Sequence, residues 1–297
     1  MKRNRKRFQF APYLYLAPAL IIFGIFTYWP MLYGFYLSFH NWNFVRPTKG
    51  FVGLSNYIKM LGREDFRIAL VNTGKYFLGL IPLLIFIPIL LAFIVGLCSK
   101  SRMKSAYRTL LFFPSVLSFS VASIIWIWLL NPVGGLVNKI LAQFGFDGPA
   151  WIADPRWALL TIVVIAGWKM LGNNFILFMS AFEGVPTSYV EAAVLDGATF
   201  WQRFWYIELP MVSPTTFFVF TTTLIFSTTN VFTPIHVLTR GGPFNSTTNL
   251  SYMIYDAAFQ YFNVGLASSV AVVTFIIFLV ANLIQSRFSE RGVHYGS

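Results

Sequence analysis

A lysine in the middle of an apolar stretch is the first side chain in this sequence whose chemistry needs an explanation. Lys169 lies within the apolar segment 158–182. A charge at the centre of a bilayer costs about 3 kcal/mol, so such residues face a water-filled cavity, a partner or backbone carbonyl groups. Two interpretations stay open. Lys169 contributes to a solute path or an interface, or it binds carbonyl oxygens inside a helix bundle.

Amide, hydroxyl and indole side chains accompany this lysine in segment 158–182 and in the apolar segment 215–238. Such groups bind a sugar or polyol through hydrogen bonds and ring stacking. A helical hydroxyl more often bonds to its own backbone, whereas an amide is harder to satisfy in lipid, so the asparagines are the stronger candidates. With Lys169, the candidate residues of a solute path are Trp168, Asn173, Asn174, Ser227 and Asn230.

The sequence lacks the residue clusters of common catalytic and energy-coupling sites. It contains no G-x-x-x-x-G-K-[ST], H-E-x-x-H or G-x-S-x-G pattern, and its single cysteine, Cys98, excludes an intramolecular disulfide. All ten acidic residues lie outside the apolar segments, whereas proton- and sodium-driven transporters usually keep carboxylates in the membrane. We therefore expect no catalytic residue, metal or cofactor in this chain. An intramembrane enzyme is the weakest alternative.

The elements that must position these residues are membrane helices. Of the 297 residues, 57% are hydrophobic and 11% are charged, against about a quarter charged in soluble domains. A membrane helix needs about 20 mostly apolar residues. Six segments meet this length: 13–37, 74–98, 109–130, 158–182, 215–238 and 265–285. We predict an all-α membrane protein with one six-span domain, 13–285, between a basic tail, 1–12, and a second tail, 286–297.

The basic residues predict the orientation of the chain. Five precede the first span, and four more crowd the short connection 99–108. Because cytoplasmic loops carry an excess of Lys and Arg, both termini are expected in the cytoplasm. The net charge of +12 is concentrated at the ends of apolar segments, where topology and anionic lipid explain it. We therefore expect contact with membrane lipid and no binding of nucleic acid.

The longest cytoplasmic connection, 183–214, carries two helix-start signals. Ser188 and Glu191 have the S-x-x-E spacing of a capping box, which predicts a helix that starts near Tyr189. Thr199 and Gln202 repeat this spacing and predict a second helix.

Between the two predicted helices stands Gly197, where a helix can end in a left-handed conformation. Pro210 and Pro214 are expected to end the second helix. The pattern is typical of a helix-turn-helix that projects from the cytoplasmic end of the bundle. Such a rigid projection suits a partner protein that pushes on it.

Within this segment, the residues Glu191-Ala192-Ala193, Asp196-Gly197-Ala198, Phe204, Ile207 and Leu209-Pro210 resemble the E-A-A loop of the membrane subunits of bacterial ATP-binding cassette importers. Three further motifs are similar to the carbohydrate-uptake branch, which includes maltose and glycerol-3-phosphate permeases. They begin at Gly53, Trp126 and Gly241. The resemblance covers nearly the whole chain, although the extra N-terminal spans of the enteric maltose subunit are lacking.

The resemblance implies a set of partners. In that family the E-A-A loop docks into a cleft of a dimeric cytoplasmic ATPase, which binds ATP and Mg. The permease pairs with a second, homologous permease subunit, and an extracytoplasmic solute-binding protein delivers the solute. The residues to which the resemblance assigns ATPase coupling are Glu191, Ala192, Ala193, Asp196, Gly197, Phe204 and Pro210.

Together these features predict the permease subunit of an ATP-driven importer that forms half of a path for a sugar or a glycerol-3-phosphate-like solute. The alternative is a stand-alone secondary transporter for a small polar solute. The missing intramembrane carboxylates and the segment 183–214 both disfavour this alternative. Only the importer needs an ATPase and a second permease, so co-purification distinguishes the two.

Overall fold

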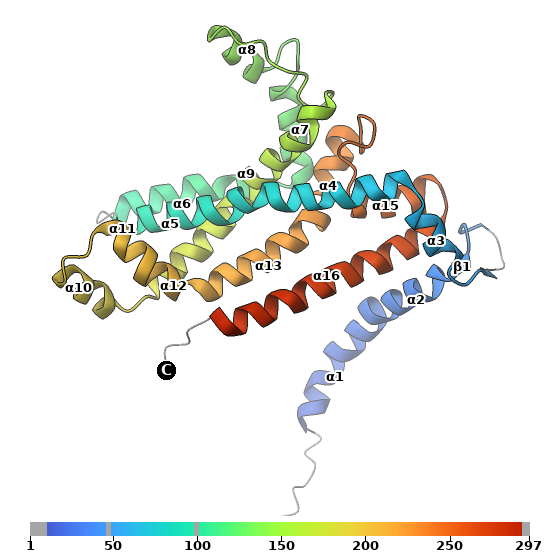
Figure 1. Cartoon of the computed structure of the whole chain (residues 1–297), viewed down its shortest axis with the longest axis horizontal. Helices are drawn as coiled ribbons and strands as arrows, with labels where there is room; N and C mark the ends of the chain where they lie inside the picture. Colours follow the sequence, from blue (N-terminus) through green and yellow to red (C-terminus); the bar gives the residue numbers. More distant parts are fainter. Residues whose placement is uncertain (1–10, 46–48, 98–100, 293–297) are drawn as a thin grey trace, which may run out of the picture. The chain divides into compact units, whose positions relative to one another are not determined.

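The computed structural model of the protein describes residues 11–45, 49–97 and 101–292, which are almost entirely helical (Figure 1). Most of the predicted basic tail, Cys98 and the last residues of the predicted C-terminal tail lie outside this part of the chain. The fold divides into two compact units. One comprises Met1–Gly62 with Ile254–Val273, and the other comprises Arg63–Met253 with Thr274–Ser297.

The first unit combines a membrane-length helix with a short β-ribbon. The buried Asn56 of the short helix after the ribbon holds these parts together, because its Nδ2 donates hydrogen bonds to the carbonyl oxygens of Ser38, at 2.8 Å, and His40, at 3.0 Å. The ribbon is antiparallel, with His40 opposite Phe51. The elements are α1 (Ala11–Phe23), η1 (Gly24–Tyr28), α2 (Trp29–Ser38), β1 (His40–Asn41), β2 (Gly50–Phe51), α3 (Ser55–Leu61), η5 (Asp256–Gln260) and the first part of α16 (Val264–Gly292).

The second unit is a helix bundle in which α9 lies alongside α5 and α6, and α13 lies alongside α4 (Figure 1). Its longer helices are α4 (Glu64–Ile81), α5 (Ile87–Gly96), α6 (Ser101–Val116), α7 (Phe119–Leu129), α9 (Pro155–Glu183), α13 (Ser213–Thr229) and the second part of α16. The shorter ones are η2 (Pro82–Phe86), α8 (Leu136–Gln143), α10 (Thr187–Leu195), α11 (Phe200–Arg203), η3 (Phe204–Glu208), α12 (Leu209–Met211), α14 (Phe232–Pro234) and η4 (Ile235–Thr239). Helix α15 (Leu250–Tyr255) joins this unit to the first.

Within the described residues, five helical stretches are long and apolar enough to cross a membrane: Leu14–Ser38, Glu64–Gly96, Pro155–Glu183, Ser213–Thr239 and Val264–Arg287. The predicted span 109–130 is not one straight helix, because Arg102–Val116 and Phe119–Leu129 meet at 95°, and the described residues hold up to six spans when this bent pair counts as one. The break has a local cause. The side chain of Ser118 accepts a hydrogen bond from the backbone N–H of Val121 at 3.2 Å and so starts a new helix.

Several helices continue through a proline by widening the turn before it. The π turns η1, η2 and η3 each end two residues before a proline: Pro30, Pro88 and Pro210. Proline has no N–H, and its ring crowds the carbonyl four residues earlier, so a wider turn relieves the clash. Pro210 therefore stands inside α12, which ends at Met211. The second helix of segment 183–214 thus ends between Pro210 and Pro214, as the sequence predicts.

The core of the second unit lies where α5, α9 and α13 meet, and it is rich in phenylalanine. Its buried members include Phe93, Phe175, Phe178, Met179 and Phe204. A close approach of α9 to α6 flanks this core. A Cβ at Gly172 would lie 2.1 Å from the carbonyl oxygen of Leu111, so only glycine allows the two backbones to come so near.

Candidate functional site

The segment 183–214 folds as a helix, a turn and a helix. Its first helix, α10, starts at Thr187 rather than near Tyr189, and no side chain caps it. The predicted capping box of Ser188 and Glu191 is therefore wrong. Pro186 explains the earlier start, because its ring holds φ at −60° in the N-cap position and leads the chain directly into the helix.

The turn between the two helices is a Schellman motif centred on Gly197. The N–H of Ala198 donates to the carbonyl of Ala193 at 2.9 Å, and the N–H of Gly197 donates to the carbonyl of Val194 at 3.1 Å. Gly197 has φ +76°, a left-handed conformation in which a side chain is strained. The predicted helix end at Gly197 is confirmed.

The second helix begins with the predicted capping box. The N–H of Gln202 donates to Oγ1 of Thr199 at 3.4 Å, and the N–H of Thr199 donates to Oε1 of Gln202 at 2.7 Å. The end of α10, the turn at Gly197 and the start of the second helix are thus all closed by hydrogen bonds between residues within a dozen positions of one another. The segment has a defined shape without any partner.

The coupling candidates divide into an exposed set and a buried set. Glu191, Ala192, Asp196, Gly197 and Pro210 are exposed, whereas Ala193 is buried. Phe204 is only 4% exposed. Its ring centroid lies 4.6 Å from that of Phe93 on α5, so Phe204 attaches the segment to the core of the bundle.

An ion pair that sequence reasoning missed closes the second half of the segment. Nη2 of Arg203 lies 2.9 Å from Oε1 of Glu208, and both side chains are largely buried. The two residues are five positions apart, so the usual search for helix pairs at three or four positions does not find them. The π turn η3 brings them to the same side of the helix.

Lys169 is 6% exposed and binds the end of α6. Its Nζ lies 3.3 Å from the carbonyl oxygen of Ser115 and 4.2 Å from the ring centroid of Phe119. The last carbonyl groups of a helix have no partner within it, and a cation there is favourable. These contacts match the second of the two interpretations, in which the lysine binds carbonyl oxygens inside the bundle.

Two of the other path candidates also bond within the bundle. Nδ2 of Asn174 donates to the carbonyl of Leu84 at 2.7 Å, and Oγ of Ser227 donates to the carbonyl of Leu224 at 2.7 Å. Both residues are buried. The amide of Asn174 thus joins α9 to η2, whereas the hydroxyl of Ser227 bonds to the backbone of its own helix, α13.

The remaining path candidates are more accessible. Trp168 is half-buried with its ring edge-on to Trp126, at 5.6 Å between centroids. Asn173 is half-buried, with Nδ2 3.5 Å from the sulfur of Met170, and Asn230 is exposed as the C-cap of α13. Two apolar cavities of about 480 and 280 Å³ in this unit are lined by other residues.

A second feature that the sequence did not reveal is a loop held by α4. Nδ2 of Asn72 lies within hydrogen-bond distance of three carbonyl oxygens, those of Asn245, Ser246 and Thr248, at 3.0–3.2 Å. One turn further, the hydroxyl of Tyr76 donates to the carbonyl of Thr247 at 2.9 Å. This loop contains the Gly241-Gly242-Pro243 motif. Buried polar side chains four positions apart on one helix are the signal that could have predicted such a contact.

A bundle of membrane-length helices with a capped helix-turn-helix between two of them is the arrangement expected for the membrane subunit of a binding-protein-dependent importer. The chain belongs to the family of binding-protein-dependent transport system inner membrane components, whose family model matches residues 76–292. It is 32% identical to the sn-glycerol-3-phosphate transport system permease protein UgpA of Agrobacterium fabrum, over 96% of each chain. It is 33% identical to the probable ABC transporter permease protein YurN of Bacillus subtilis, over 95% of this chain and 96% of that protein.

The fold agrees with a solved structure of the same kind. A crystal structure of a bacterial alginate ABC transporter, in complex with an alginate pentasaccharide-bound periplasmic protein, contains a chain that superposes with a TM-score of 0.84 at 25% identity. The match covers 97% of this chain and 96% of that chain. The protein is therefore a multi-pass inner-membrane permease subunit of an ABC importer that receives its solute from a periplasmic binding protein. It is not itself catalytic, because ATP is hydrolysed on partner subunits.

Proposed function

We propose that this chain forms half of the transmembrane path for a sugar or a glycerol-3-phosphate-like solute and that segment 183–214 transmits the movement of an ATPase dimer. The observation that carries the proposal is the shape of this segment. Its turn is closed by backbone bonds at Gly197, its second helix is capped by Thr199, and Phe204 attaches it to the core. A segment held together in this way can move as a unit and pass the movement of a partner on to the bundle without deforming.

The surface of the segment suits a protein partner. Glu191, Ala192 and Asp196 are exposed and lie on or next to α10. Large side chains are exposed beside them: Tyr189, Leu195, Trp201, Trp205 and Tyr206. Aromatic residues are over-represented at the centres of protein interfaces. Exposed carboxylates and aromatic rings on one rigid body support docking of the segment on the ATPase.

The first span supports pairing with a second, homologous permease. The most apolar window of Leu14–Ser38 has none of its residues buried by the rest of the described chain. A helix that is apolar all round is surrounded by lipid or by another protein. A neighbouring permease subunit would cover part of this surface.

The substrate class rests on the relatives and on the accessible polar side chains. One relative is named for sn-glycerol-3-phosphate and another for alginate. Asn173, Asn230 and the indole of Trp168 remain available for hydroxyl groups and sugar faces. The charge of Lys169 is directed at the end of α6, so it does not by itself select an anionic solute.

The test is reconstitution of the complex. The tagged chain, purified in mild detergent, should retain the ATPase and a second permease. In proteoliposomes the complex should take up solute only with ATP inside and the binding protein outside. Glycerol-3-phosphate and neutral oligosaccharides are compared as solutes. Uptake by the chain alone, driven by a proton or sodium gradient, would contradict the proposal.

A further inference from the structure

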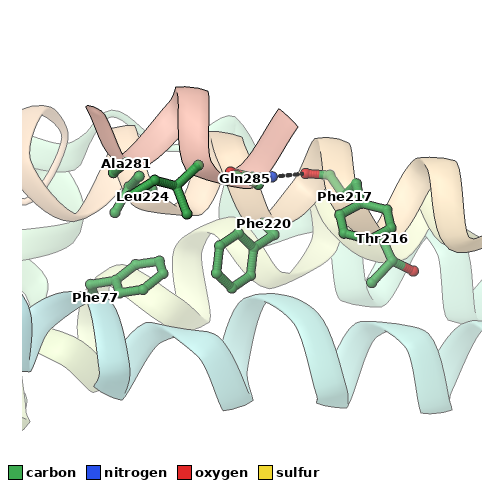
Figure 2. A pocket seen from close by; sticks show the side chains of 8 residues that line it. Phe77, Thr216, Phe217, Phe220, Leu224, Ala281 and Gln285 are labelled. Carbon is green, nitrogen blue, oxygen red and sulfur yellow. Dashed lines mark hydrogen bonds between the residues drawn. The ribbon is translucent and has the colours of Figure 1, made fainter. Parts of the chain in front are cut away.

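An apolar cavity of about 480 Å³ lies between α4, α13 and α16 in the second unit (Figure 2). Phe77 of α4 and Phe220 of α13 lie edge-on to one another at 5.3 Å between ring centroids, and Ala281 and Gln285 of α16 lie on the side away from α4. The other lining residues are Thr216, Phe217, Leu224 and Ile284. The volume falls within the range of small-molecule binding sites, about 300–1,000 Å³.

Gln285 supplies the polar group of this cavity. Its Nε2 donates to the carbonyl oxygen of Phe217 at 2.8 Å and also contacts the hydroxyl of Thr221. Its Oε1 is buried and has no hydrogen-bond partner among the described residues. An unpaired buried acceptor in a membrane helix is unfavourable, so a donor from outside the chain would stabilise it.

In the orientation expected from the sequence, with segment 183–214 and the C-terminus in the cytoplasm, the cavity lies in the cytoplasmic half of the membrane. Helix α13 begins at Ser213, at the end of segment 183–214, and Thr216 and Phe217 are in its first turns. Gln285 lies near the end of the last span, two residues before the exposed Arg287. The neighbouring outer surface of α13 and α16 is apolar, with Phe218, Ile225 and Leu283 exposed. The exposed surface of these two helices therefore suits contact with lipid hydrocarbon.

We propose that this cavity binds one acyl chain of a phospholipid from the inner leaflet. The walls suit a hydrocarbon chain, whereas a sugar would leave its hydroxyl groups unpaired there. The Oε1 of Gln285 accepts a hydrogen bond from a hydroxyl group of the lipid headgroup, and the exposed Arg287, two residues further along the chain, is available to the phosphate. Charge complementarity and the apolar walls thus select the same molecule. None of the residues that line the cavity is among the candidates for the solute path, and the proposal does not depend on which solute is carried.

The test uses the complete complex in nanodiscs that contain phosphatidylglycerol with a photoactivatable group on one acyl chain. After illumination, peptide mapping locates the label. We expect label on the residues that line the cavity at no less than five times the yield on the exposed residues Phe218 and Leu283. Equal labelling of cavity and surface would overturn the proposal.

Two cavity variants and one control variant sharpen the result. Ala281→Phe places a ring in the cavity and should lower the cavity label at least five-fold. Val280→Phe adds the same ring to the neighbouring exposed position and should leave the label unchanged. Gln285→Leu should lower the label without filling the cavity. Unchanged label in both cavity variants would overturn the proposal. So would a disulfide between a cysteine at 281 and the second permease, because that result makes the cavity a subunit interface.

Discussion

The ammonium group of Lys169 caps α6 through the carbonyl oxygen of Ser115, at 3.3 Å, while the hydroxyl of Ser115 donates to the carbonyl of Lys169 at 2.9 Å. This reciprocal contact joins α9 to the end of α6, where the chain bends by 95° into α7. Gly172, one turn along α9, lets the two helices approach closely. Lys169 therefore helps to fix the bend between α6 and α7.

Lys169→Met should lower the stability of the complex by about 2 kcal/mol, because the end of α6 loses its cation. The measurement is thermal unfolding of the purified complex. Lys169→Arg keeps the charge and should retain most of the stability. If Lys169 contacts the solute instead, Lys169→Met would change the KM or the solute preference while stability stays the same.

Gly197→Val should loosen the ATPase and abolish uptake. A side chain at φ +76° costs about 1 kcal/mol or more, and relief of that strain would open the turn. The measurements are the ATPase retained by the tagged chain and ATP-driven uptake by vesicles. Gly184→Ala is the matched control in the same segment, because Gly184 has φ −81° and tolerates a side chain. Full uptake by Gly197→Val would show that the turn is not needed for coupling.

Arg203→Met should destabilise segment 183–214 by about 3 kcal/mol, because it leaves the buried carboxylate of Glu208 without its partner. Replacing both residues, with Arg203→Met and Glu208→Leu, should recover much of this loss. Proteolysis of the segment in the purified complex measures the effect. A double variant that is cleaved faster than either single variant would refute the pairing.

Asn72→Ala should free the loop 241–249, because three carbonyl oxygens lose a donor. The expected cost is about 2 kcal/mol, and Tyr76→Phe, which removes one bond, should cost about 1 kcal/mol. Hydrogen exchange of the loop amides is the measurement. The two variants should rank in this order. The reverse order would show that Asn72 does not hold the loop.

The start of α9 should weaken at acidic pH. Asp154 caps this helix, and its hydrogen bonds from the side chain and the backbone N–H of Arg156 lower its pKa. A carboxyl whose pKa is lowered on folding contributes stability that is present above its unfolded value, about 3.9, and is lost as pH falls through the folded value. Hydrogen exchange at 154–158 should rise below about pH 4 in the wild type relative to Asp154→Asn. Equal pH profiles would contradict the assignment.

The features that depend on neighbours along the chain could be predicted from the sequence. Gly197 ends a helix and Thr199 with Gln202 starts the next one, because the bonds involved close within six residues. The family motif and the membrane helices follow from the same local patterns. The one failure in this segment, the helix start at Thr187, arose where Pro186 competed with a capping box.

Only the tertiary structure decided which polar groups meet across the bundle. Lys169 and Ser115 are 54 positions apart, and Asn72 and Thr248 are 176 apart. Phe204 belongs to segment 183–214, most of which is exposed. Its ring nevertheless enters the core, because η3 turns it toward Phe93. The residue type determines which chemical groups a side chain can bond, but the residue that it bonds in the structure depends on which helix faces pack together. That packing is set by burial summed over many side chains, which no local pattern contains.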